Sequence, residues 1–231
     1  MTDEATTDRR TVMTAGLALT ALAATLAAAP ALAADAAPAA QPLPFDPARL
    51  GWLSERLIVS HHDNNYIGAV KRLAAIQAEF ARLDVGTAPG FAVNGLKREE
   101  LVAWNSMILH ELYFAGLGAP AAPSAALAQA IERDFGSQAR WAAEFAAMGK
   151  ALGGGSGWVL LTWSHRDRRL TNQWAADHTM TLAGATPVLA LDMYEHAYAM
   201  DFGAKAGAYV DGFMKNTAWT NAGKVFARAV A

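Results

Sequence analysis

The chain of 231 residues contains no cysteine. This absence excludes disulfide bridges, thiolate zinc sites and cysteine-held iron–sulfur clusters. It also suits an oxidising compartment, where a free thiol would be oxidised. Charged residues make up only 17% of the chain, and the net charge of −2 with a sequence pI near 6.3 shows no basic excess. We therefore expect no nucleic-acid partner.

Residues 1–33 have the features of a signal peptide of the twin-arginine type. Arg9 and Arg10 stand side by side, an apolar run covers 12–29, and residues 31–33 supply a small-residue cleavage site. We expect export of the folded protein to a periplasmic or secreted location. The alternative is an uncleaved membrane anchor, but the run is rich in alanine and short against the ~20 residues of a span. We expect no stable membrane partner.

Three segments are expected after the signal peptide. Residues 34–44 are rich in alanine and proline, which predicts a flexible linker. Residues 45–119 carry long helical patterns and form an N-terminal helical hairpin domain. Residues 120–231 mix helical and strand patterns and form a C-terminal α/β domain. Since 53% of the chain is hydrophobic, a sizeable core can be buried.

The hairpin consists of two helices joined by a loop at 86–95. The first helix runs from about Ser54 to Arg82, and the second from about Lys97 to Gly116. After Leu101 the second helix is apolar on nearly all sides, so we expect it to be buried. The apolar stripe of the first helix comprises Leu53, Leu57, His61, Asn65, Ala69, Leu73, Ile76 and Phe80.

The C-terminal domain reads as helices, then strands, then helices. Ser124 and Ser137 are typical N-cap residues for two helices that end near Gly136 and Leu152. Strands are expected at 158–163, 170–174 and 187–191, and further helices at 194–202, at 205–216 and up to the C-terminus. The fold class is therefore α+β: a long N-terminal α-hairpin packed on a C-terminal α/β domain with a small three-stranded antiparallel sheet.

Two of the six histidines lie on the apolar faces of the hairpin. His61 falls on the stripe of the first helix, and His110 is in line with apolar residues of the second. If the helices pair, both imidazoles point into the same interior. A single histidine in such a place is more often a core residue with satisfied hydrogen bonds, but burying two without a partner or a metal is costly.

Asp192 and His196 supply a second pair of donors. Asp192 comes where the last expected strand ends, and His196 follows one helical turn later. Three imidazoles and one carboxylate form a nitrogen–oxygen ligand set that suits iron or manganese, and also zinc. Taken alone, Asp192 could merely cap the following helix.

The other motifs give weaker evidence of function. His62 lies off the stripe beside Asp63 and is interpreted as solvated or structural, and His165 lies in a charged turn. His110 and Glu111 open like the zinc-protease motif H-E-x-x-H, but Phe114 occupies its last position. The sequence has no G-x-S-x-G elbow, no P-loop and no G-x-G-x-x-G.

The sequence resembles the iron/manganese superoxide dismutase family over nearly all of the chain after the signal peptide. Residues 192–198 (DMYEHAY) match the family's D-x-W-E-H-A-Y, with Tyr194 in place of tryptophan. Residues 155–158 (GSGW) are similar to its strand entry, and residues 109–114 (LHELYF) to its N-H-x-x-F-W segment. His61 and His62 fit the first-helix motif in a register that makes His61 the ligand.

The resemblance implies a superoxide dismutase: one Fe or Mn ion per chain, superoxide as substrate, and a homodimer. Its catalytic group would be a metal-bound solvent molecule, with no separate catalytic residue. The implied metal ligands are His61, His110, Asp192 and His196, and the groups around them are Glu195, Trp158, His178 and Tyr194.

The groups around the ligands have separate implied roles. Glu195 would extend into a neighbouring subunit and form a hydrogen bond with a ligand histidine there. Trp158 would form one wall of the site. The family's outer-sphere glutamine has no match, because the second helix offers Ser106 at that place. Gln173, Asp177 and His178 are the other candidates, of which we favour His178.

Three positions depart from the family pattern. Ala69 stands where the family has a gateway tyrosine, Asn65 where it has a second histidine, and Ala199 where it has a second tyrosine. These groups line the substrate funnel and tie subunits together in the family. The altered funnel motivates one rival function, a metal-binding relative without useful dismutase activity. A second rival is a zinc hydrolase that uses the same ligands.

Overall fold

The computed structural model describes residues 38–231. The predicted signal peptide, its alternative as an anchor and the start of the predicted linker lie outside this range. Within it, none of the helices combines the length and apolar content needed to cross a membrane. The end of the predicted linker is held in place: Gln41 donates its backbone N–H to the Tyr66 hydroxyl at 2.7 Å, and Leu43 packs against the core.

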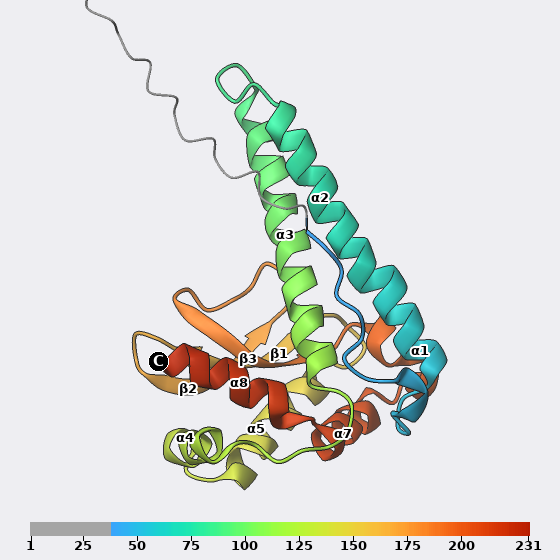
Figure 1. The fold of residues 1–231 in the computed structure, drawn as a ribbon, viewed down its shortest axis with the longest axis vertical. Helices are drawn as coiled ribbons and strands as arrows, with labels where there is room; N and C mark the ends of the chain where they lie inside the picture. The colour runs from blue at the N-terminus through green and yellow to red at the C-terminus, as the bar shows by residue number, and fades with distance from the viewer. Residues whose placement is uncertain (1–37) are drawn as a thin grey trace, which may run out of the picture. The chain divides into compact units, whose positions relative to one another are not determined.

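The N-terminal hairpin is formed by two helical arms (Figure 1). The first arm consists of α1 (Glu55–Ser60), the π-helical turn η2 (His61–Tyr66) and α2 (Ile67–Arg82), and it follows the short 3-10 turn η1 (Pro47–Arg49). Ser54 caps α1, since its Oγ accepts the N–H of Leu57 at 3.1 Å. The second arm is the single helix α3 (Gly90–Ala115).

The π-turn is the main departure from the expected first helix. The backbone N–H of Ile67 bonds the carbonyl of His62, five residues earlier, so this turn holds one residue more than an α-helical turn. As a result His61 and Tyr66 are both buried, although α-helical spacing places Tyr66 off the stripe. π-turns inside α-helices are frequent at functional sites.

Two expectations for the second helix were wrong. The helix begins at Gly90, so the second half of the predicted loop at 86–95 is helical. Packing against α2 outweighs the low helix propensity of the glycines there. The helix is also not buried all round: Leu101, Trp104 and Ile108 are 46%, 45% and 39% exposed, because α2 and β3 cover its other sides.

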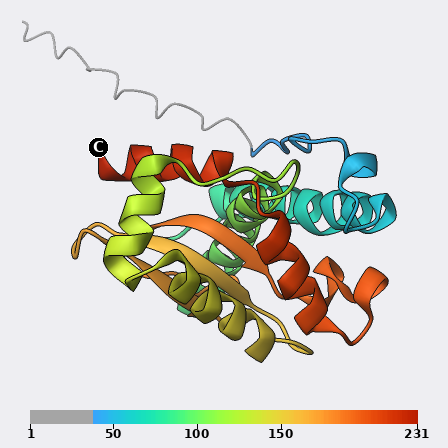
Figure 2. The ribbon, with the colours of Figure 1, turned by 90° about the horizontal axis from the view of Figure 1, so that it is seen from below.

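The sheet has the predicted three antiparallel strands in the order β2-β1-β3. These are β1 (Trp158–Ser164), β2 (Arg169–Ala175) and β3 (Ala185–Asp192). Every residue of β1 is buried, so both faces of the central strand are covered. Figure 2 shows α5 (Gln138–Ala151) below the sheet and α8 (Trp219–Val230) above it.

The predicted caps of the C-terminal domain are present. Ser124 Oγ caps α4 (Ala125–Phe135), which ends at Gly136 in the left-handed conformation, and Ser137 Oγ caps α5. The fold class is confirmed: a helical hairpin on an α/β domain with a three-stranded antiparallel sheet.

The helix expected at 194–202 was wrong, because it is broken in two. A 3-10 turn, η3 (Glu195–Ala197), is followed by the short helix α6 (Ala199–Phe202) and then by α7 (Ala206–Asn216). The break falls at Tyr198, whose φ is −146°. Its buried hydroxyl accepts the N–H of Gly154 at 3.1 Å, so tertiary contact outweighs helical continuity here.

Candidate metal centre

Four donor side chains converge from four different places in the fold. His61 opens the π-turn and His110 lies in α3, while Asp192 ends β3 and His196 sits in η3. In the sheet register Asp192 pairs with Trp158, the first residue of β1. The structure therefore brings together all four ligands predicted from the sequence.

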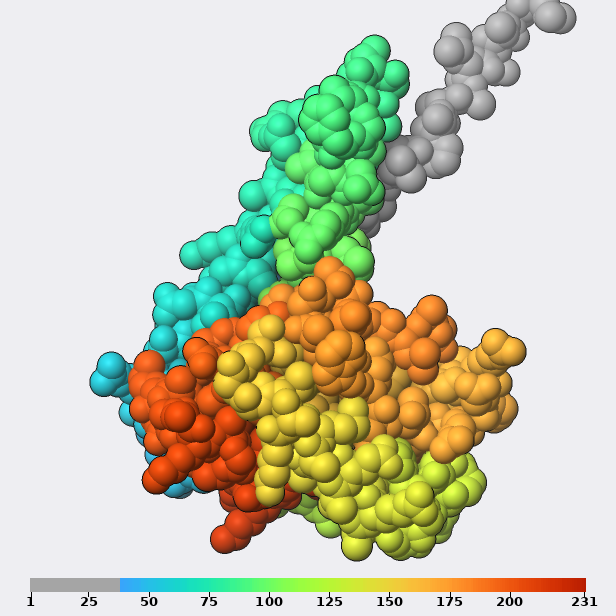
Figure 3. All heavy atoms as spheres, turned by 180° about the vertical axis from the view of Figure 1, so that it is seen from behind, coloured from blue at the N-terminus to red at the C-terminus, as the bar shows by residue number. Residues whose placement is uncertain are grey.

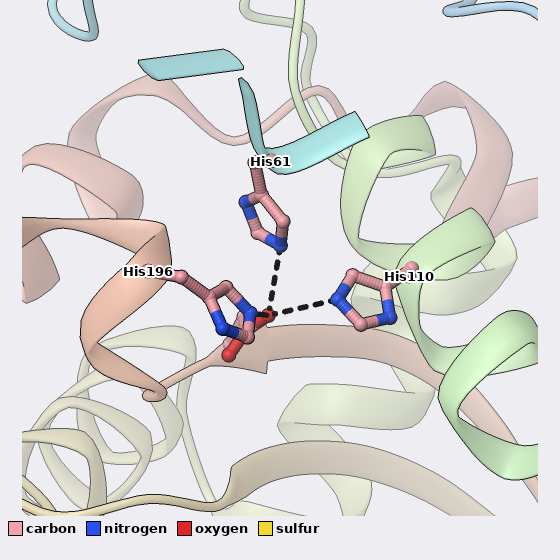
Figure 4. Close-up of side chains that lie close together, drawn as sticks. His61, His110 and His196 are labelled. Carbon is pink, nitrogen blue, oxygen red and sulfur yellow. Dashed lines mark hydrogen bonds and ion pairs between the residues drawn. The ribbon is translucent and has the colours of Figure 1, made fainter. Parts of the chain in front are cut away.

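The three imidazoles point their Nε2 atoms at one carboxylate oxygen (Figure 4). Asp192 Oδ2 lies 3.2 Å from His61 Nε2, 3.5 Å from His110 Nε2 and 3.2 Å from His196 Nε2. All four donor atoms lie within 4.8 Å of one another. Donors bound to one ion at about 2.0–2.2 Å are separated by roughly 3–4 Å, so these need to move little to share a metal.

Burial sets the charges of the centre. Desolvation lowers the pKa of His61 and lowers that of His110 to about 3, so both rings are neutral at pH 7. Burial alone would raise the pKa of Asp192, but the neighbouring imidazoles of His196 and His61 hold it well below its usual range. The centre therefore presents the neutral nitrogens of His61 and His110 and one anionic oxygen, the protonation states in which these groups bind metals.

Hydrogen bonding at the histidines fits a metal as well. His110 Nδ1 lies 2.6 Å from the backbone carbonyl of Ser106 and donates to it, which leaves a lone pair on Nε2. The Nε2 atoms of His61 and His110 are buried and have no hydrogen-bond partner within residues 38–231. Unpaired buried nitrogens are costly, and a bound metal would satisfy both.

An aromatic wall and His178 lie beside the ligands. The Trp158 ring meets the His110 ring edge-on at 5.3 Å between centroids, and Tyr194 stacks on His178 at 4.8 Å. Trp158 Nε1 donates to His178 Nδ1 at 3.0 Å, and so the proton of this neutral ring sits on Nε2. Burial lowers the pKa of His178, which keeps the ring neutral.

A hollow of about 280 Å³ lies between the two arms of the hairpin, beside the centre. Asn65, Ala69, Arg72, Ser106 and His178 are among the residues that line it. Figure 3 shows the segment between β2 and β3 (orange) against α3 (green), where Asn105 Nδ2 donates to the carbonyl of His178 at 2.6 Å. This contact holds His178 at the hollow.

The remaining candidates lie outside the cluster. Gln173 and Asp177 are tied to their own loop: Gln173 Oε1 accepts the N–H of Leu182 at 2.9 Å, and Asp177 Oδ1 accepts the N–H of Thr179 at 2.7 Å. Glu195 is exposed and has no side-chain hydrogen bond within the part of the chain that the structure describes.

One supporting residue, Tyr209 of α7, stands in no motif or pattern that marks it in the sequence. Its hydroxyl donates to the backbone carbonyl of Asp192 at 2.8 Å, and the Tyr113 hydroxyl lies 3.1 Å from it. The contact fixes the end of β3, where the carboxylate ligand stands. Tyr209 lies 17 residues from Asp192 in the chain, so only the tertiary fold reveals it.

Comparison with known proteins agrees with the geometry. Residues 123–225 match the family described as iron/manganese superoxide dismutases, C-terminal domain. Superoxide dismutase [Fe] of Cupriavidus metallidurans is 67% identical over 190 residues, which cover 82% of this chain and 96% of that protein. Superoxide dismutase [Mn] 1 of Halobacterium salinarum is 33% identical over 193 residues, covering 81% and 94%. Superoxide dismutase [Fe] of Aquifex pyrophilus is 32% identical over 194 residues, covering 80% and 89%.

Proposed function

The chain belongs to the iron/manganese superoxide dismutase family, and on this premise we propose that its centre holds iron and converts superoxide to dioxygen and hydrogen peroxide. The observation that carries the proposal is the convergence of three Nε2 atoms on Asp192 Oδ2 at 3.2–3.5 Å in a buried site. When bound, the metal supplies the one-electron steps, alternating between its trivalent and divalent states.

Iron is favoured over manganese by the relatives. The dismutase that is 67% identical is named for iron, whereas one named for manganese is 33% identical. The ligand set itself suits either metal. Metal analysis of the purified protein is therefore the measurement that decides between them.

The protein's part is to supply an anionic ligand and to position a hydrogen-bond donor beside the centre. The buried Asp192 carboxylate favours the more highly charged state of the metal, since an anion in a site with little water interacts strongly with a cation. Two protons are needed for each peroxide formed. Solvent supplies these protons. His178 carries its proton on Nε2 and borders the hollow, so we propose that it is the hydrogen-bond donor beside the centre.

The hollow admits an anion the size of superoxide. Ala69 leaves space where the family has a tyrosine, and the Arg72 guanidinium on its lining brings positive charge to the entrance. Part of that charge is offset by the ion pair of Arg72 with Glu99. The remaining field would still favour approach of a small anion.

Two further proposals concern the oligomeric state and the location of the enzyme. The exposed Glu195 carboxylate is available to a second chain, which supports the expected homodimer. The composition of residues 1–33 supports export by the twin-arginine route. Cell fractionation with N-terminal sequencing would test the export proposal, and protein confined to the cytoplasm with residue 1 retained would contradict it.

The function is tested on purified protein by metal content and superoxide consumption. We expect about one iron per chain, removal of the iron by a chelator to abolish consumption, and reloading to restore it. Iron without consumption would identify a metal-binding relative that has lost the activity. Zinc as the bound metal would favour a hydrolase.

The role of His178 predicts a loss of activity without a loss of bound iron. His178→Leu should keep its iron but lose about 10–100-fold in superoxide consumption, because the outer hydrogen-bond donor is gone. His178→Gln should recover part of it, since an amide can still donate. Consumption and iron content of both variants check this, with exposed His165→Leu as the control. Equal rates for the leucine variant and wild type would exclude the role.

A further inference from the structure

The hydroxyl of Tyr66 joins three segments that are far apart in the sequence. It accepts the backbone N–H of Gln41 at 2.7 Å and donates to Glu111 Oε1 at 2.9 Å. Gln41 belongs to the N-terminal strap, residues 38–46, which precedes η1. Tyr66 is the last residue of the π-turn, and Glu111 lies in α3. One buried side chain therefore connects the strap to both arms of the hairpin.

The hydrogen bond between Tyr66 and Glu111 lies next to two metal ligands. The π-turn that ends at Tyr66 begins with His61, and Glu111 directly follows His110 in α3. The rings of Tyr66 and His110 are 6.5 Å apart, and those of His61 and His110 are 5.0 Å apart. The bond thus ties together the two segments that carry these ligands, close to the ligands themselves.

Side-chain packing is incomplete where the strap meets α3. A hollow of about 370 Å³ borders Tyr66 and Glu111, and its lining also includes strap residues 41–44. Hydrogen bonds hold the strap across this gap, and both backbone polar groups of Gln41 take part. Its N–H bonds the Tyr66 hydroxyl, and its carbonyl, which can only accept, lies 3.0 Å from His62 Nε2.

The π-turn needs support of this kind. A π-turn holds one residue more than an α-helical turn and is rare, so we expect its geometry to depend on contacts outside the helix. The Tyr66 hydroxyl is suited to provide one. Burial raises the pKa of Tyr66 to about 12, so the hydroxyl keeps its proton at pH 7 and remains a donor.

Resting on the proposed iron site, we propose that Tyr66 is a positioning residue: its hydroxyl fixes the π-turn against α3 and so keeps the Nε2 atoms of His61 and His110 directed at the metal. Within residues 38–231 this hydroxyl bonds Gln41 and Glu111 but neither ligand. It therefore acts on where the two imidazoles lie and leaves their protons unaffected.

The test compares variants of the full-length iron-loaded protein. Tyr66→Phe keeps the ring and removes the hydroxyl, so iron loss to excess chelator should become about 3–10-fold faster, the effect expected when one buried hydrogen bond is lost. Glu111→Leu removes the acceptor and should act alike, whereas Glu111→Gln keeps an acceptor oxygen and should lose iron near the wild-type rate. Thr217→Val is the matched control, since its buried hydroxyl bonds the Phe213 carbonyl at 2.8 Å, outside the ligand cluster.

The electron paramagnetic resonance signal of the ferric protein separates positioning from a general loss of stability. The shape of this signal depends on how the ligands are arranged around the iron. Tyr66→Phe and Glu111→Leu should therefore change it. Thr217→Val should lower the Tm of the protein and leave both the signal and the rate of iron loss as in wild type.

Wild-type iron loss and an unchanged signal in Tyr66→Phe would overturn the inference, and so would equal rates of iron loss from Glu111→Leu and Glu111→Gln. Glu111 is only half-buried, so this second pair decides the question even if Tyr66→Phe does not fold. Wild-type protein that holds iron but consumes no superoxide would refute the proposed function and leave these comparisons valid, because neither readout needs turnover.

Discussion

Replacing Asp192 by asparagine should empty the metal centre. The variant keeps the shape of the side chain but removes the anion that all three Nε2 atoms face at 3.2–3.5 Å. A neutral amide oxygen is a weaker ligand for a trivalent ion, and the amide N–H₂ competes for the same place. We expect bound iron to fall from about one per chain to under about a tenth, and superoxide consumption per chain to fall at least about 100-fold.

The matched control is Asp211→Asn, an exposed carboxylate of α7 paired with Lys150 at 2.7 Å. It removes the same charge from the chain and should leave iron and activity unchanged. Circular dichroism of Asp192→Asn should show the wild-type secondary structure. A folded Asp192→Asn protein with wild-type iron content would contradict the assignment of the carboxylate as a ligand.

Gly157→Ala should cause the largest loss of stability among single methyl additions near the site. Gly157 adopts φ +134°, and a Cβ there would lie 2.3 Å from the carbonyl oxygen of Ala175. That carbonyl belongs to the residue paired with Trp158 at the start of the sheet, so it cannot move without disturbing the register. The strain and the clash together should cost about 3 kcal/mol, a drop in Tm of roughly 6–12 °C.

Gly154→Ala separates the two causes. Gly154 also has positive φ, +80°, but a Cβ there meets nothing within 4 Å. Its substitution should cost only about 1 kcal/mol, the price of the left-handed backbone alone. Thermal unfolding of the two variants without metal measures the difference. Equal Tm values would show that the Ala175 carbonyl can move to accommodate the added methyl group.

The centre was predictable because its donors lie at positions that sequence patterns identify, such as the apolar face of a helix or the end of a strand. His110 lies on an apolar helix, Asp192 ends a strand, and His196 follows one turn later, so local patterns bring each to an inward-facing place. His178 was harder, since its loop has no periodicity. Its assignment depends on the indole of Trp158, 20 residues away in the chain.

What could not be predicted depends on contacts between distant segments. A π-turn differs from an α-turn by one residue, and the pattern of apolar residues accommodates either, so the burial of Tyr66 was missed. The break at Tyr198 arises from its hydrogen bond to Gly154, which local propensity does not report. The exposed stripe of α3, Leu101, Trp104 and Ile108, reads as core because periodicity shows apolarity without showing which sides have a partner.

The dispersion of the ligands along the chain has a consequence for how the protein matures. The first ligand lies on the π-turn and the last on η3, and the hydrogen bond between these two segments spans 131 residues of sequence. Closing so long a loop costs entropy that a local contact does not, so we expect this contact to form after the local helices. No fragment of a growing chain that ends before η3 contains the full ligand set. A tightly held metal ion is therefore a mark of completed folding, and a cell that exports only loaded protein would by the same act export only finished molecules.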